Sequence, residues 1–161
     1  MPEYRLVDVA DLPDAPGPST HKKEVDEAVK SAELSFNVFT AHPGEKIAAG
    51  YHYHPRHEEL LYVIEGELQV ETADGDYTIE PGQALYIPPG APQVSRSIGE
   101  GPARVIAIGA PKSASEGIIV ERCPVCEEET ECDYERTSEV QAVSCGNCGT
   151  EIYRYVPGPD E

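Results

Sequence analysis

Seven short runs rich in apolar and β-branched residues lie between residues 34 and 109, and they constrain the fold more than any other feature of the chain. The runs are LSFNVFT, EELLYVIEG, ELQVET, DYTIE, ALYIP, QVSRS and ARVIAIG. Turn signals separate them, among them Pro43-Gly44 and Asp74-Gly75. Many short strands at this spacing predict an all-β sandwich or barrel, for which a double-sheet jelly roll is the natural arrangement.

Two histidines and a glutamate around the start of the second run form a candidate metal site. His52 and His54 are one residue apart, so their side chains share a face on an extended segment. Glu59 follows after a short corner and opens the second run. Two imidazoles and a carboxylate directed into one interior predict a site for a divalent transition metal, and Fe, Mn, Ni, Co, Cu and Zn all accept such ligands.

The stretch HYHPRHEELLYVIEG resembles the first sequence motif of the cupin superfamily. His52, His54, Glu59 and Gly66 match its positions, whereas the glycine that leads the motif in the family is Lys46 here. The resemblance implies a cupin double-stranded β-helix, which is a jelly-roll barrel, with a metal ion held inside it. The ligand set is similar to the facial triad of non-haem Fe(II) oxygenases, which leaves open positions for water, dioxygen or substrate.

The stretch GQALYIPPGAPQVSRS resembles the second cupin motif. Gly82, Pro88 and Gly90 match it. Gln93 stands where the family has a fourth metal ligand, a histidine, and Ser97 stands where it has an asparagine. Because an amide oxygen is a poorer donor to a transition metal than an imidazole nitrogen, Gln93 is expected to be a weak ligand or to hydrogen-bond a metal-bound water.

Four cysteines near the C-terminus form a second candidate metal site. Cys123 and Cys126 make one CxxC pair, Cys145 and Cys148 make another, and eighteen residues separate the pairs. With the strand-like runs VQAVSC and EIYRYV, this spacing resembles a zinc ribbon of about 40 residues. Two disulfides or a rubredoxin-like iron site are the alternatives, although cytosolic thiols stay reduced. Cys132 fits neither pair and is expected to be a free thiol without a role.

These features predict a division of the chain into four parts. The cupin barrel is expected over residues 1–112, and the zinc ribbon over residues 121–156. Residues 113–120 are expected to be a linker, because the stretch APKSASEG is small and polar and has no apolar period. Residues 157–161 are expected to be a tail.

The composition is strongly acidic. Thirty Asp and Glu residues against twelve Lys and Arg residues give a net charge of −18. This charge argues against binding to nucleic acid or anionic lipid, because a polyanion would be repelled. Without a long apolar run or a secretion signal, the chain is expected to be cytoplasmic and not to span a membrane. Scattered carboxylates are similar to those of halophile proteins, and an acidic mesophilic protein is the alternative.

Other segments carry weaker signals. Residues 4–9 are expected to form a short strand that adds to a neighbour's sheet, and this edge together with the cupin resemblance predicts a homodimer. Residues 22–33 are expected to form one or two helical turns. His57, in the corner between the motif segments, is expected to be solvated. Residues 127–131 are almost all acidic and are expected to form a solvated loop.

Two classes of function remain open at this point. The first is a small metalloenzyme, for which the cupin resemblance implies dioxygenase, isomerase or lyase chemistry on a small molecule inside the barrel, with no catalytic residue assigned. The second is a non-catalytic sensor or adaptor, in which the barrel binds a small ligand and the ribbon docks to a protein partner. The intact set of three ligands favours the first class, and the appended ribbon favours the second.

Overall fold

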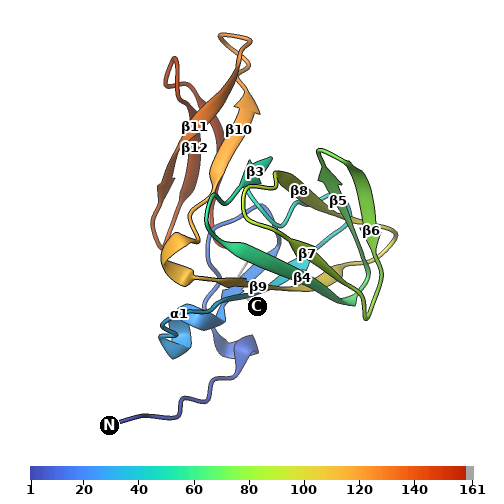
Figure 1. Ribbon diagram of the computed structural model, residues 1–161, viewed down its shortest axis with the longest axis vertical. Coiled ribbons are helices and arrows are strands. Elements are labelled where there is room, and N and C mark those ends of the chain that lie inside the picture. The colour runs from blue at the N-terminus through green and yellow to red at the C-terminus, as the bar shows by residue number, and fades with distance from the viewer. Residues whose placement is uncertain (159–161) are drawn as a thin grey trace.

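The computed structural model, which describes residues 1–158, consists largely of antiparallel strands arranged in two sheets (Figure 1). Its strands are β1 (His21–Glu24), β2 (Ser35–Ala41), β3 (His52–Tyr53), β4 (Glu58–Glu65), β5 (Glu67–Thr72), β6 (Gly75–Ile79), β7 (Ala84–Ile87), β8 (Gln93–Ile98), β9 (Ala103–Ala110), β10 (Ile118–Arg122), β11 (Glu129–Arg136), β12 (Gln141–Cys145) and β13 (Glu151–Tyr155). Three short helical segments accompany them: η1 (Val9–Asp11), α1 (Val25–Val29) and η2 (Lys112–Ala114).

The first sheet contains five strands in the order β1-β2-β9-β4-β7. β9 shows the alternation expected of a strand with one buried face, because Ala103, Val105 and Ala107 are buried and the residues between them are more exposed. Leu61 and Val63 of β4 are buried on the same side. This side faces the interior of the barrel.

The second sheet contains eight strands in the order β13-β12-β11-β10-β3-β8-β5-β6 and joins the barrel to the C-terminal strands. β10 pairs with β3, so that Ile118 lies opposite Tyr53 and Ile119 lies opposite His52. Figure 1 shows β10, β11 and β12 rising from the end of the barrel next to β3. The C-terminal strands therefore extend a sheet of the barrel.

Two hydrophobic clusters stabilise the structure. The larger lies between the sheets of the barrel, and each fully buried Leu or Val side chain there contributes about 1.5–3 kcal/mol relative to an exposed one. Its fully buried large side chains are Leu61, Val63, Leu68, Val70 and Val105. The smaller cluster lies where the barrel meets the C-terminal strands and contains Ala49, Ile119 and Val143, with Cys132, Tyr153 and Tyr155 packed against them.

Gly66 makes the tight connection between β4 and β5. Its φ angle is +74°, a left-handed conformation that residues with a side chain rarely adopt. A Cβ atom here would also lie 2.5 Å from the carbonyl oxygen of Pro102. Both the turn and the close approach of the neighbouring chain therefore require the glycine of the first motif.

The seven strands predicted between residues 34 and 109 are confirmed, with end shifts of at most one residue. The strand predicted at residues 4–9 is absent: among residues 1–158 no strand pairs with this segment, and η1 begins at its last residue. The helical prediction for residues 22–33 is partly wrong, because residues 22–24 pair with β2 as part of β1 and leave α1 only about one turn.

The C-terminal half differs more from the sequence predictions. β11 occupies residues 129–136, so the acidic stretch expected to be a loop lies partly in a strand, where pairing with β10 and β12 outweighs its charge. β10 begins at Ile118, inside the segment 113–120 expected to be a linker. Of the tail expected at residues 157–161, positions 159–161 lie outside the described residues. Within the described part of the chain, no helix is both long enough and apolar enough to cross a bilayer.

Candidate metal centre

His52, His54 and Glu59 come together inside the barrel. The ligand atoms of these three side chains all lie within 4.8 Å of one another. His52 belongs to β3, and His54 follows it directly. Glu59 shares its face of β4 with the buried Leu61, so its carboxylate points to the interior. The alternation of side chains along a strand, which the sequence analysis used, therefore explains why these three side chains come together.

Burial shifts the protonation equilibria of all three side chains toward their neutral forms. Burial raises the pKa of Glu59 to about 7. It also lowers the pKa of His54 to about 4, with the neighbouring His52 and His57 adding to the effect. Burial lowers the pKa of His52 as well, although a hydrogen bond to the carbonyl of Gly50 opposes the shift. An ionised Glu59 therefore lacks a counter-charge, which a divalent cation would supply.

The donor atoms are arranged as a metal site requires. His52 Nδ1 lies 2.7 Å from the carbonyl oxygen of Gly50. The N–H is therefore on Nδ1, and the lone pair of Nε2 is free to bind a metal. Oε2 of Glu59 is buried without a hydrogen-bond partner and lies 3.6 Å from His54 Nε2. An unpaired buried carboxylate oxygen next to two neutral imidazoles fits a divalent metal ion.

Gln93 lies beside this group, at the start of β8 and opposite His52 in the sheet. Its side-chain Nε2 is 3.5 Å from His52 Nε2, and its Oε1 is buried without a partner. Rotation of the amide by half a turn would direct Oε1 toward the group instead. Ser97, which replaces the asparagine of the second motif, is fully buried, and its hydroxyl also has no partner among the described residues.

His57 is buried, so the expectation that it is solvated is wrong. Its side chain is 3% exposed, its Nδ1 lies 2.9 Å from the carbonyl oxygen of Pro111, and its ring centroid is 5.0 Å from that of His54. A Cβ atom at Gly109 would lie 2.0 Å from His57 Nε2. The signal that could have indicated this packing is the glycine at the end of the run ARVIAIG, where a strand with one buried face would otherwise carry a side chain.

A cavity of about 830 Å³ adjoins the three-residue group, and His52, His54, His57 and Glu59 line one part of it. Residues of β1, α1, β2, β10, β11 and β12, together with loop residues such as those at 47–49 and 115–117, line the rest. A Cβ atom at Gly117 would lie 3.1 Å from His52 Cδ2, so the segment before β10 covers the histidines closely. A cavity of this size accommodates a small organic molecule.

The four paired cysteines also come together, at the far end of the C-terminal strands. Their sulfur atoms all lie within 4.8 Å of one another. The Sγ atoms of Cys123 and Cys148 are 3.6 Å apart, and those of Cys126 and Cys145 are 3.7 Å apart. Four thiolates at about 2.3 Å from a tetrahedral zinc ion would have sulfur atoms about 3.8 Å apart. The cysteine group is therefore compatible with a zinc ribbon.

Cys132 lies outside this group of four. It belongs to β11, stands opposite Cys145 in the sheet, and packs against the small cluster formed by Ala49, Ile119 and Val143. Burial raises the pKa of its thiol. The side chain therefore contributes to packing where the barrel meets the C-terminal strands.

The two-sheet barrel resembles that of cupin domains. Residues 37–109 match the family described as Cupin domain, Cupin_2. The structure resembles the polyketide cyclase RemF from Streptomyces resistomycificus, with a TM-score of 0.58 and 21% identity over 71% of this chain and 84% of that chain. It also resembles a cupin protein from Bacteroides fragilis, with a TM-score of 0.58 and 18% identity over 73% and 92% of the two chains. These likenesses show the fold alone, and the predicted cupin double-stranded β-helix is confirmed.

Among curated proteins, the chain is similar to a protein named polyketide synthase CurC, from Streptomyces cyaneus. The two are 38% identical over 64 residues, which are 40% of each chain. The chain spans less than half the length of each of the curated relatives that it matches.

Proposed function

We propose that the barrel binds a divalent transition metal at His52, His54 and Glu59 and converts a small molecule in the adjoining cavity. The observation that supports this proposal most strongly is the convergence of three ligand atoms within 4.8 Å at the wall of a cavity of about 830 Å³. Three protein ligands leave coordination positions open on such an ion. The bound metal would supply Lewis-acid or redox chemistry to oxygen atoms of the substrate.

The side chains around the metal would hold the substrate in place and exclude water. The hydrogen bond from His52 to the carbonyl of Gly50 fixes the orientation of that ring. Ile119 and the segment at Gly117 cover the histidines on the side of the C-terminal strands. His57 lines the cavity next to His54 and is close enough to hydrogen-bond a substrate bound beside that ring. No catalytic acid or base is assigned among these residues.

We propose a substrate that carries a carbonyl and a hydroxyl group close together. Two such oxygens can bind one metal ion through the positions that the protein leaves open. The names of the similar proteins, a polyketide synthase and a polyketide cyclase, support this class, because polyketides are built from carbonyl and hydroxyl groups. A dioxygenase, an isomerase and a lyase would all act on such a molecule.

The second candidate function is a ligand sensor that docks to a protein partner through its C-terminal strands. One observation favours it: the same cavity is lined by barrel residues and by β11, so a bound ligand would contact both parts. An adaptor would bind its ligand without converting it. Conversion of the ligand therefore distinguishes the two functions.

We further propose that the four cysteines bind zinc and that the C-terminal strands need this ion to fold. The sulfur–sulfur distances of 3.6 and 3.7 Å support the proposal because they are close to those of a zinc tetrathiolate. A unit of this size buries too little apolar surface to be stable by its core alone.

An ortho-hydroxylated aromatic ketone tests the function of the barrel. Calorimetry would measure its binding to the metal-loaded and metal-free chain, and mass spectrometry would detect conversion in air. We expect binding that requires the metal and is lost in His54→Ala and Glu59→Gln. His42→Ala is the matched control, since His42 is exposed and lies outside the cavity. Binding that survives without metal would contradict the proposal, and metal-dependent binding with no conversion would favour the sensor.

A further inference from the structure

Several polar atoms on the wall of the cavity have no partner. The side-chain oxygens Asp26 Oδ1, Asn37 Oδ1 and Gln141 Oε1 are buried and make no hydrogen bond with any described residue. All three residues line the cavity, and Asp26 and Gln141 are only 5% and 6% exposed. A buried acceptor without a donor is unfavourable by about 1–3 kcal/mol. Three of them around one cavity point to a ligand that donates hydrogen bonds there.

A lysine that lines the same cavity also lacks a partner. Lys22 lies opposite the core residue Phe39 across β1 and β2, and facing residues of antiparallel strands share a side of the sheet. Its side chain therefore points toward the cavity, which it lines. Its ammonium forms no hydrogen bond or ion pair with the described residues. Burial disfavours its charge most and Arg136 adds to this effect, whereas Glu24 and Asp26 oppose it.

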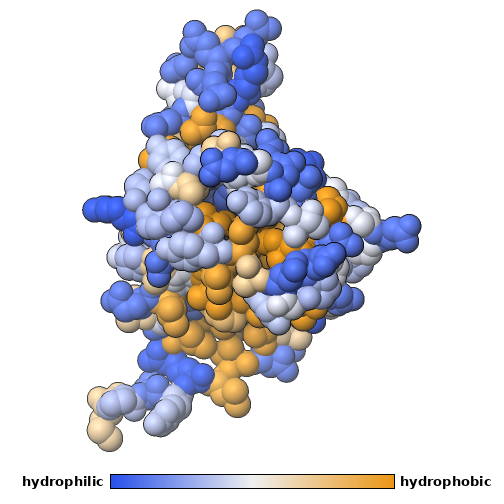
Figure 2. Space-filling model, turned by 45° about the vertical axis from the view of Figure 1, so that its right-hand side comes forward, coloured by the Kyte–Doolittle hydropathy of each residue, from blue (hydrophilic) through white to orange (hydrophobic). Residues whose placement is uncertain are grey.

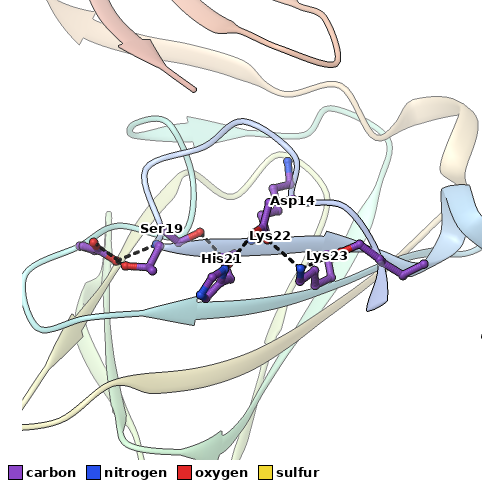
Figure 3. A network of polar contacts seen from close by, with 8 residues as sticks. Asp14, Ser19, His21, Lys22 and Lys23 are labelled. Atoms are coloured by element: carbon purple, nitrogen blue, oxygen red, sulfur yellow. Dashed lines mark hydrogen bonds and ion pairs between the residues drawn. The ribbon is translucent and has the colours of Figure 1, made fainter. Parts of the chain in front are cut away.

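The next residue on the strand behaves differently. Lys23 points to the opposite side of β1, where its ammonium lies 2.7 Å from the carbonyl oxygen of Leu12 and 3.3 Å from Asp14 Oδ1. Figure 3 shows Asp14 in contact with both His21 and Lys23 beside β1. Lys23 is thus paired within the fold, whereas the ammonium of Lys22 can bind a ligand in the cavity.

The opposite wall belongs to the C-terminal strands. Gln141 is the first residue of β12, and its side-chain amide donates a hydrogen bond of 2.7 Å to the hydroxyl of Tyr134 in β11. This bond holds the amide in place, and in this orientation Oε1 is the atom left free. Arg136 lines the same region but is paired with Glu24. The free polar atoms around the cavity therefore come from β1, α1 and β2 on the barrel side and from β12 on the side of the C-terminal strands.

We propose that Lys22, Asn37 and Gln141, together with Asp26, form a subsite that binds hydroxyl groups on the part of the ligand that extends away from the metal. Hydroxyl groups can each donate to one of the free oxygens and can also accept from the lysine ammonium, whereas an ionised carboxylate or phosphate can only accept. The inference rests on the proposed function of the barrel, since the metal would hold the other end of the ligand. It assigns recognition of the ligand jointly to the barrel and the C-terminal strands.

Two aromatic ketones test the subsite with the full-length chain loaded with zinc. One probe is a benzophenone with a single hydroxyl ortho to the carbonyl, which offers the metal a pair of oxygens and offers the subsite nothing. The other is a tetrahydroxybenzophenone that keeps this pair and adds hydroxyls on both rings. We expect the second to bind at least about tenfold more tightly, the effect of one or two net hydrogen bonds, some of them to a charged group.

Two variants and a control locate the effect. We expect Lys22→Met and Gln141→Leu each to weaken binding of the tetrahydroxy probe by about tenfold and to leave the monohydroxy probe unchanged. Lys23→Met, on the other side of the same strand, should leave both affinities unchanged. If Gln141→Leu fails to fold, Lys22→Met still tests the subsite, because the unbranched methionine side chain packs like the aliphatic part of lysine.

Each remaining outcome is decisive. If the tetrahydroxy probe binds no better than the monohydroxy probe, or keeps its advantage in Lys22→Met, the subsite is wrong while the metal-binding function of the barrel stands. If Lys22→Met weakens the binding of both probes equally, the subsite is also wrong, since the substitution would then act through the metal centre. If neither probe binds to the metal-loaded chain, the proposed function itself fails.

Discussion

Ile119 of β10 lies directly opposite His52 of β3 in an antiparallel pair. The strand that leads into the cysteine group is therefore hydrogen-bonded to the strand that carries a candidate ligand of the barrel metal. The two candidate metal sites are chemically distinct, but His52 of the first and Cys145 of the second lie in the same eight-stranded sheet. The two metal ions should bind independently, although the paired strands that connect the two sites stabilise one another.

The first prediction is that the protein carries two metal ions per chain. Imidazole and carboxylate ligands form one site and four thiolates form the other. A substitution in one site should therefore remove that site's ion and leave the other ion bound. We expect Cys145→Ser to lose the zinc and keep the barrel metal, and His54→Ala to do the reverse. Elemental analysis of the purified variants checks this. A single ion in the unaltered protein, or joint loss of both in either variant, would contradict it.

The second prediction concerns Gln93, whose amide lies 3.5 Å from His52 Nε2. An amide oxygen coordinates a transition metal weakly, so Gln93→Ala should weaken metal binding by only about tenfold. Gln93→His should tighten it by adding a third imidazole as the fourth protein ligand. Titration of metal into the metal-free proteins measures both. If Gln93→Ala abolishes binding as completely as His54→Ala, Gln93 is a full ligand.

The parts of the site that could be predicted are those that depend on strand alternation and spacing. His52, His54 and Glu59 needed only a period of two and a short corner to share an interior, and the two CxxC pairs needed only their own tight turns. The seven barrel strands carry apolar runs bounded by turn residues, and for this reason the sequence revealed their positions. None of these features depends on contacts between segments far apart in the chain.

The parts that could not be predicted depend on such contacts. Residues 22–24 have no apolar pattern and become a strand only because they pair with β2. β11 is acidic and is held by β10 and β12 on either side. His57 is buried because Gly109, fifty-two positions away in the sequence, leaves room for its ring. The cavity wall formed by β1 and β12 was missed for the same reason.

The third prediction is that Lys22 lowers the stability of the fold by an amount that depends on pH. Burial lowers the pKa of its ammonium to about 8; Arg136 adds to the effect, and Glu24 and Asp26 oppose it. In the unfolded chain the group titrates near pH 10.4, so between about pH 8 and 10 the unfolded state binds more protons and stability from this group rises with pH. Lys22→Met should therefore be more stable than the unaltered protein at neutral pH, and its advantage should shrink as the pH rises.

Urea denaturation from about pH 7 to about pH 10 measures this difference. Other charged or titratable groups line the same cavity, and their contributions should cancel when the two proteins are compared; they include Glu24, Asp26, Glu27, Lys112, Tyr134 and Arg136. Lys23→Met is the control and should lose stability, since Lys23 is paired with Asp14. An advantage of Lys22→Met that stays constant with pH would show that its ammonium is not desolvated.

The fourth prediction is a homodimer formed through the outer face of the five-stranded sheet. Because the strand expected at residues 4–9 is absent, that edge cannot form the interface. Instead, two rows of apolar residues cross the outer face in register: Phe36, Ile108, Leu60 and Tyr86 in one, and Val38, Ile106 and Tyr62 in the other. Figure 2 shows an apolar area on the barrel, below the C-terminal strands. The residues of these rows are uncharged in a chain of net charge −18, although the neighbouring Glu58 accepts a hydrogen bond from the hydroxyl of Tyr86, so a second copy would meet less repulsion there than over the rest of the surface.

Sedimentation velocity tests the dimer. We expect the unaltered protein to sediment as a dimer and Tyr62→Glu to sediment as a monomer, because a charge would be buried in the interface. Tyr77→Glu is the matched control, since Tyr77 is 48% exposed on β6 of the other sheet. A monomeric unaltered protein, or an equal effect of both substitutions, would contradict the prediction.

The fifth prediction follows from the net charge of −18. If the carboxylates adapt the protein to salt, dilution should remove the screening between them and destabilise the fold. The melting temperature should therefore fall from molar to millimolar KCl, with zinc and barrel metal held saturating. A melting temperature that stays the same or rises at low salt would favour the mesophilic alternative.

The pairing of β10 with β3 has a consequence for any shortened version of the barrel. β3 is only two residues long, and on its other side it contributes one residue, His52, to the pairing with β8. Removal of the chain after residue 117 would uncover the backbone N–H and C=O groups of β3 and leave an open sheet edge. We expect a barrel cut at this point to aggregate edge to edge, which light scattering would detect, while the full-length chain covers that edge with its own strand.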